Sequence, residues 1–199
     1  IIEVSLETRA YNQAEWQILQ YEFKHELNAY LKKYGHSNIP SSLEELIAFN
    51  LEHADEELAF FGQEIFESSE VKGDLNEKEY LDAVDTARNE AAGQIDGIMD
   101  EHQLDALIAP TNGPSWVVDI INGDQFTGGS SSAAAVAGYP NVTVPSGTIK
   151  SLPIGLSFFG KKWSDYTLLS LASQYESRFN PRKTPTYQKT LNPLESASS

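Results

Sequence analysis

Three short apolar runs in the second half of the chain limit the folds that this sequence can adopt. They span residues 106–109, 142–144 and 154–159, and each is followed directly by Pro or Gly. Short apolar runs of this kind are typical of strands buried on both faces, whereas a half-exposed strand alternates apolar and polar residues. The sequence therefore predicts three core strands in this half of the chain.

A Gly- and Ser-rich segment separates the first two predicted strands. Residues 123–132 lead into an Ala-rich stretch at 133–137, which is followed by Gly138 and Pro140. Ser before an Ala-rich turn, Gly at its exit and Pro just beyond predict a short helix with both ends specified. Polar loops above buried strands often carry the ligand sites of α/β proteins. We therefore expect part of any functional site in this segment.

Helices are predicted before and after the strands. Apolar residues recur every three or four positions in residues 10–34, and the resulting stripe, which includes Trp16 and Tyr30, is expected to face the core. A second helix is expected after Ser42, where Ser and Glu residues form overlapping capping boxes, and a long helix is expected to end near Met99. A long helix followed directly by a buried strand indicates the α/β class.

Composition excludes several classes of function. The formal net charge of −15 argues against nucleic acid or an anionic membrane as a partner, because both require surfaces rich in Lys and Arg. The 199 residues include no cysteine, which rules out disulfides and thiolate metal sites. The length suits a single domain over residues 1–199, and the polar, Pro-bearing tail at 180–199 is expected to be loose.

The search for catalytic groups gives candidates but no complete set. The four histidines lie on or beside predicted helices, and the G-x-S-x-G elbow of many serine hydrolases is absent, so a Ser-His-Asp triad is not favoured. The acidic residues around His53 lack a second histidine at metal-ligand spacing, so no metal site is predicted. The segment from Gly128 to Ser132, GGSSS, is the most suggestive stretch, either as a pocket wall or as a helix cap.

An ordered set of motifs resembles one enzyme family. The chain carries APT at 109–111, GYPNVTVPSG at 138–147 and LPIGLSFFG at 152–160, preceded by YEFKHELNAYL at 21–31 and FGQEIF at 61–66. In this order they resemble the C-terminal portion of the amidase signature family of serine amidohydrolases. Within that family the sequence looks most like peptide-amide and general amidases. The resemblance implies an α/β fold in which a mixed central β-sheet is flanked by helices.

The resemblance also implies a chemistry. Members of this family hydrolyse a carboxamide to a carboxylate and ammonia or an amine through a Ser–Ser–Lys arrangement, without a metal or an organic cofactor. Here Ala133 and Ala134 stand where the family has a Gly pair, and no strand ending near Lys-Asp is present. We therefore expect no catalytic residue in this chain, which by itself should be inactive. The catalytic groups would lie in an N-terminal part of the same enzyme.

The expected role of this chain is one wall of the substrate pocket. The substrate would be a small amide or a peptide amide, and the location would be cytoplasmic. The pocket candidates are Thr111, Asn112, Phe126, Thr127, Gly129, Ser130 and Ser131. Apolar strands without their neighbours should also make the isolated chain self-associate, so dimers or higher oligomers are expected. Two alternatives stay open, namely a non-catalytic binding or assembly module and a tRNA-dependent amidotransferase A subunit.

Overall fold

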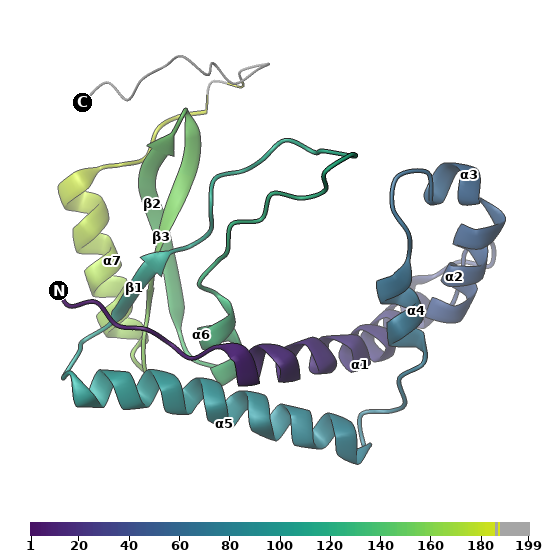
Figure 1. Ribbon diagram of the computed structural model, residues 1–199, viewed down its shortest axis with the longest axis horizontal. Coiled ribbons are helices and arrows are strands. Elements are labelled where there is room, and N and C mark those ends of the chain that lie inside the picture. Colours follow the sequence, from purple (N-terminus) through teal and green to yellow (C-terminus); the bar gives the residue numbers. More distant parts are fainter. Residues whose placement is uncertain (186, 188–199) are drawn as a thin grey trace. The chain divides into compact units, whose positions relative to one another are not determined.

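The computed structural model describes residues 1–185 and 187, so the tail predicted to be loose at 180–199 lies largely outside the described residues (Figure 1). The helices of the described part are α1 Arg9–Tyr34, α2 Leu43–Glu52, α3 Ala54–Glu57, α4 Glu64–Glu70, α5 Lys78–Glu101, α6 Ser132–Ala137 and α7 Asp165–Phe179. Its strands are β1 Leu107–Pro110, β2 Asn141–Ile149 and β3 Leu152–Phe159. The described residues divide into two compact units, one formed by Arg9–Ala87 and the other by Ile1–Thr8 together with the described residues from Arg88 onward.

The unit Arg9–Ala87 is helical, and side chains on α1 hold its helices together. Phe23 on α1 stacks at a tilt against Phe66 on α4, with ring centroids 5.4 Å apart. The Asn28 side chain accepts a hydrogen bond from the backbone N–H of Leu43 at 2.7 Å, which fixes the first residue of α2. The predicted cap of α2 is confirmed, because the Ser42 hydroxyl accepts from the backbone N–H of Glu45.

The predicted core face of α1 is wrong in part. Trp16 is 49% exposed and Tyr30 is 59% exposed, whereas Tyr11 and Tyr21 are each 1% exposed. The Tyr21 hydroxyl lies 2.8 Å from carboxylate oxygens of two glutamates at residues 77 and 79, so polar contacts fix the buried face of the helix. Apolar periodicity alone therefore placed part of the buried face wrongly.

The other unit contains a three-stranded sheet in the order β1-β3-β2. β1 and β2 both pair antiparallel with β3, so the described residues form a small antiparallel sheet, and the mixed central sheet of which it was expected to be a part stays a prediction. β2 and β3 form a hairpin, which explains their direction, since a two-residue turn can join only antiparallel strands. Val144 and Phe158 pack with Leu168 and Ala172 of α7, and Figure 1 shows α7 alongside β2 and β3.

The short helix predicted after the Gly- and Ser-rich segment is confirmed as α6. Gly138 ends it in the left-handed conformation, with φ of 70°, and the backbone N–H of Tyr139 donates to the carbonyl of Ala134 at 2.9 Å. The Tyr139 hydroxyl donates to the carboxylate of Asp96 on α5 at 2.8 Å. In the part of the chain that the structure describes, every helix falls short of the length and apolar character needed to cross a bilayer.

Candidate functional site

The candidate site lies where β1 ends and the Gly- and Ser-rich segment returns to the sheet. The Thr111 backbone N–H donates to the carbonyl of Gly155 at 2.9 Å, which extends the pairing with β3 by one residue. The Thr111 carbonyl accepts from the backbone N–H of Ser130 at 3.1 Å, and Asn112 forms an antiparallel bridge with Gly129. Two limbs that are far apart in the sequence are thus held together beside the sheet.

The absence of a side chain at Gly129 favours this close approach. A Cβ atom at that position would lie 2.2 Å from Oδ1 of Asn112 and 3.2 Å from the Thr111 carbonyl oxygen. Across the same two limbs, a Cβ on Gly113 would lie 1.8 Å from Oγ1 of Thr127. The predicted pocket residues Thr111, Asn112 and Gly129 therefore come together, with Thr127 beside them.

Three hydroxyl groups form a hydrogen-bonded network next to this point, which we name the hydroxyl cluster: Thr111, which is half-buried, Thr143, which is exposed, and Ser157, which is buried. Oγ1 of Thr111 lies 2.9 Å from Oγ of Ser157 and within hydrogen-bond distance of Oγ1 of Thr143. Thr143 and Ser157 are cross-strand partners on β2 and β3, and Ser157 is 1% exposed. The cluster satisfies polar groups that would otherwise be costly inside the sheet.

Sequence reasoning missed Thr143 and Ser157 as members of the site. Both are hydroxyl residues inside or next to an apolar run, and a polar residue in a run that reads as buried requires a hydrogen-bond partner. That signal was present in the sequence, but the register of the strands was needed to show that the two side chains meet Thr111.

The serines of the GGSSS segment do not cap α6 through their side chains. Ser131 occupies the N-cap position of α6 without a side-chain cap hydrogen bond and is exposed, so the predicted capping role is wrong for this residue. Oγ of Ser130 is buried and has no hydrogen-bond partner among the described residues. An unpaired buried hydroxyl is unusual, because its lost hydration is not replaced.

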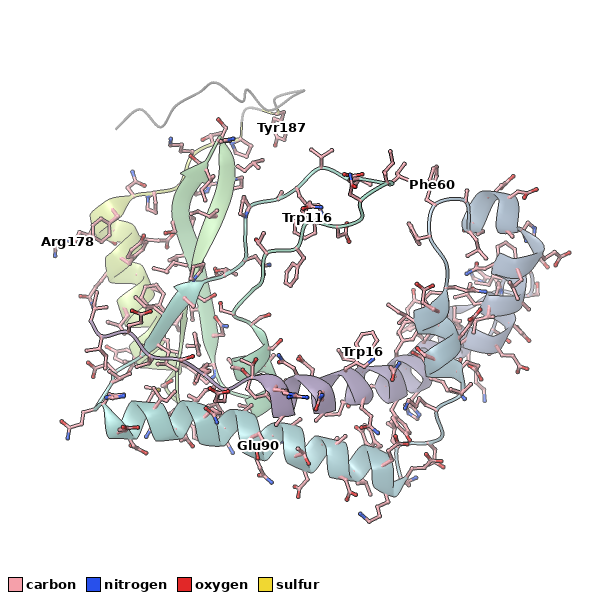
Figure 2. The ribbon with its side chains drawn as sticks, in the orientation of Figure 1. Trp16, Phe60, Glu90, Trp116, Arg178 and Tyr187 are labelled. Carbon is pink, nitrogen blue, oxygen red and sulfur yellow. The ribbon has the colours of Figure 1, made fainter. Side chains whose placement is uncertain are left out.

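Phe126 lies farther out, on the loop between β1 and α6. It is 64% exposed, and its ring meets that of Trp116 edge to face with centroids 6.1 Å apart; Figure 2 labels Trp116 on this loop. Nε1 of Trp116 donates to Asp124 at 3.1 Å. At the turn of the loop, hydrogen bonds from the Asn122 side chain and backbone hold the pKa of the Asp119 carboxyl below its usual value. The loop is therefore ordered by local contacts and presents an aromatic pair.

The two lysines that follow β3 make contacts elsewhere. Lys161 forms an ion pair with Asp100, and Nζ of Lys162 lies 5.5 Å from the ring centroid of Trp163. Within residues 1–185 and 187, no cluster of three or more His, Cys, Asp or Glu side chains could hold a metal ion. The site consists of hydroxyl, amide and backbone groups, which can orient a polar, uncharged substrate by hydrogen bonds.

An antiparallel sheet backed by α7, with a Gly- and Ser-rich segment returning to the end of β1, forms the frame of the candidate site. The profile of the Amidase family matches residues 1–169. The chain belongs to the amidase signature family, as its motifs indicated.

The similar proteins include enzymes that act on peptide amides. The chain is 42% identical to the native peptide amidase of Stenotrophomonas maltophilia, with a TM-score of 0.81 over 93% of this chain and 37% of that one. The structure of the peptide amidase PAM in complex with the competitive inhibitor chymostatin is 43% identical, with a TM-score of 0.81 over 89% of this chain and 36% of that one. A probable amidase of Arabidopsis thaliana is 33% identical over 83% of this chain and 29% of its own length. The chain thus spans about a third of the length of these relatives.

Proposed function

We propose that this chain is part of an amidase that hydrolyses the carboxamide of a peptide amide to a carboxylate and ammonia. The observation that carries the proposal is the likeness to the peptide amidase of Stenotrophomonas maltophilia, in which 42% identity and a TM-score of 0.81 extend over 93% of the chain. Agreement of sequence and backbone over nearly the whole chain supports a shared reaction more strongly than the fold alone.

The chemical step belongs, in this proposal, to a Ser–Ser–Lys set contributed by a part of the enzyme outside these residues. A nucleophilic serine gives up its hydroxyl proton and attacks the carboxamide carbon, and the C–N bond breaks as the NH2 group takes up that proton and leaves as ammonia. Water then hydrolyses the acyl-enzyme, which releases the carboxylate and restores the serine. The present chain contributes substrate contacts at the wall formed by Thr111, Asn112, Thr127, Gly129 and Ser130. Phe126 supplies an apolar contact, and Ser131 lies at the rim.

The arrangement suits recognition of an uncharged amide. An amide group offers N–H donors and a carbonyl acceptor, and the hydroxyl groups of serine and threonine can serve either role. The Asn112 side chain offers a donor and an acceptor in one plane. Because these groups are held by the bridge between Asn112 and Gly129, their positions need little rearrangement when a substrate binds.

A chimeric enzyme tests this function. Residues 1–199 would replace the matching segment of the Stenotrophomonas maltophilia peptide amidase, and ammonia release from a peptide amide would be measured. We expect turnover within about tenfold of the parent enzyme, because one or two altered pocket contacts change kcat/KM by roughly that much. A folded chimera that releases no ammonia from any peptide amide contradicts the proposal.

The isolated chain supplies the second half of the test. We expect it to hydrolyse no amide, since the Ser–Ser–Lys set is placed outside it. If the purified chain released ammonia and the Ser131→Ala variant lost that activity, the catalytic serine would lie in the GGSSS segment. The assignment of this chain to a non-catalytic pocket wall would then be wrong.

A further inference from the structure

Ser130 stands apart from its neighbours because its hydroxyl is buried without a partner. Oγ of Ser130 has no hydrogen-bond partner among the described residues, while its backbone N–H is fixed by the Thr111 carbonyl at 3.1 Å. Alanine in its place would keep that backbone bond and avoid the cost of a buried, unsatisfied hydroxyl. The hydroxyl therefore lowers the stability of the fold, and no hydrogen bond among the described residues offsets this cost.

The backbone at Ser130 is fixed through Thr111, which is itself hydrogen-bonded to two strands. Thr111 contacts Ser130 through its carbonyl and enters the hydroxyl cluster through its side chain, where it meets Ser157 at 2.9 Å. Thr143 contacts the same Thr111 hydroxyl from β2. Three strands thus fix the peptide group that positions Ser130.

From these two observations we infer that the Ser130 hydroxyl is a substrate-binding group and that the hydroxyl cluster positions it. The inference rests on the proposed function and specifies it further: the ligand is a polar group of a peptide amide, its carboxamide or an adjacent peptide unit. A hydroxyl without a protein partner keeps its donor and its lone pairs available for a substrate, whereas a capped or bridged hydroxyl has to break a bond first.

In this inference the Ser130 side chain rotates to meet the substrate. Ser130 is partly exposed as a residue although its Oγ is covered, so the covered atom lies on the inner side of a residue that solvent reaches. Rotation about the Cα–Cβ bond moves the hydroxyl between staggered positions without displacing the backbone. The bound substrate would select the outward rotamer.

Opposite changes in stability and in substrate affinity would identify this role. In the isolated chain, Ser130→Ala should raise Tm by about 2–4 °C, because it removes an unsatisfied buried group. In the chimera with the peptide amidase, the same variant should raise KM about 5- to 10-fold, the size of one hydrogen bond, with kcat changed less than 3-fold. The control is Ser37→Ala, an exposed serine in the turn between α1 and α2 and outside the candidate site, which should change neither quantity.

The positioning role of the cluster has its own variants. Thr111→Val removes the hydroxyl that contacts Ser157 and should raise KM in the chimera. Thr111→Ser keeps a hydroxyl at this position and should have the same KM as the parent chimera. A merely structural role would lower Tm in both variants without this difference in KM.

Each other outcome overturns a stated part of the inference. If Ser130→Ala lowers the Tm of the isolated chain, the hydroxyl has a partner in the protein and is not held free for substrate. If Ser130→Ala and Ser37→Ala give the same KM in an active chimera, Ser130 is excluded as a substrate contact and the proposed function stays intact. Loss of kcat without a change in KM would show that Ser130 takes part in the chemical step and is not a binding group alone. A chimera that is inactive toward every amide refutes the proposed function, and the inference falls with it.

Discussion

Substitution of Gly155 by alanine should disrupt the hydroxyl cluster from within the sheet. Gly155 lies on β3, and a Cβ added to it would be 2.8 Å from Oγ1 of Thr111 and 2.9 Å from Oγ1 of Thr143. Ordinary contact begins near 3.4 Å, so both hydroxyls would have to withdraw by roughly 0.5 Å. Both belong to side chains that neighbouring strands and their shared hydrogen bonds hold in place.

The magnitude follows from three contributions. Displacement of the two hydroxyls by the added Cβ costs about 1–3 kcal/mol, the range for overpacking. Loss of the 2.9 Å hydrogen bond between Thr111 and Ser157 adds about 0.5–1.5 kcal/mol. Replacement of glycine by alanine returns about 0.5–1 kcal/mol, because the unfolded chain loses conformational freedom. We therefore expect Gly155→Ala to lower the free energy of unfolding by about 2 kcal/mol.

Urea unfolding followed by circular dichroism measures this change. The matched control is Gly93→Ala on α5, where an added Cβ meets no atom within 4 Å, and which should gain up to about 1 kcal/mol from helix propensity. In a background with Thr111→Ala and Thr143→Ala, the cost of Gly155→Ala should fall by at least about 1 kcal/mol, because the obstructing hydroxyls are gone. If Gly155→Ala unfolds within 0.5 kcal/mol of the parent chain, as a rough limit of the measurement, the packing argument is refuted.

Three further predictions concern other parts of the molecule. Leu168→Ala should cost about 2–5 kcal/mol because Leu168 is 0% exposed, whereas Leu169→Ala on the same helix, where Leu169 is 57% exposed, should cost less than about 1 kcal/mol; equal urea midpoints would contradict this. The pKa of Tyr21 is raised above 10 by its hydrogen bond to Glu79, by burial and by its hydrogen bond to Glu77. The Tyr21 hydroxyl therefore stabilises the fold fully below pH 10, and this stabilisation falls as pH rises above 10. Tyr21→Phe should therefore flatten the loss of Tm between about pH 9 and 11 relative to Tyr30→Phe, and parallel curves would count against it. The isolated chain should bind an apolar dye and form dimers or larger species in sedimentation, and a strictly monomeric chain that binds no dye would exclude exposed sticky surfaces.

The elements that local sequence determines were predictable. The helix expected at 10–34 is α1, Arg9–Tyr34, and the short helix before Gly138 is present with its left-handed end. Both depend on periodicity and on caps, which are properties of neighbouring residues. The three apolar runs also fall on β1, β2 and β3, because their breaks at Pro and Gly are local too.

Features that depend on pairing were not predictable in the same way. The β2–β3 hairpin turns at Lys150 and Ser151, whose φ angles are 48° and 68°. Asn-Gly is the usual sequence for this turn, so Lys-Ser gave no signal that the two strands are antiparallel. The meeting of Thr111, Thr143 and Ser157 depends on register across three strands. The seven pocket candidates remain predictions, although the structure brings several of them together at one point.

The bridge between Asn112 and Gly129 also bears on how this family can diversify. It closes the intervening loop at its base, so residues added to or removed from the tip change neither the strand end nor α6. The entropy of closing such a loop grows only logarithmically with its length, and a doubled tip would cost about 0.6 kcal/mol. The segment between residues 114 and 126 can therefore vary in length and sequence, in evolution or by design, while the end of β1 and α6 keep their structure.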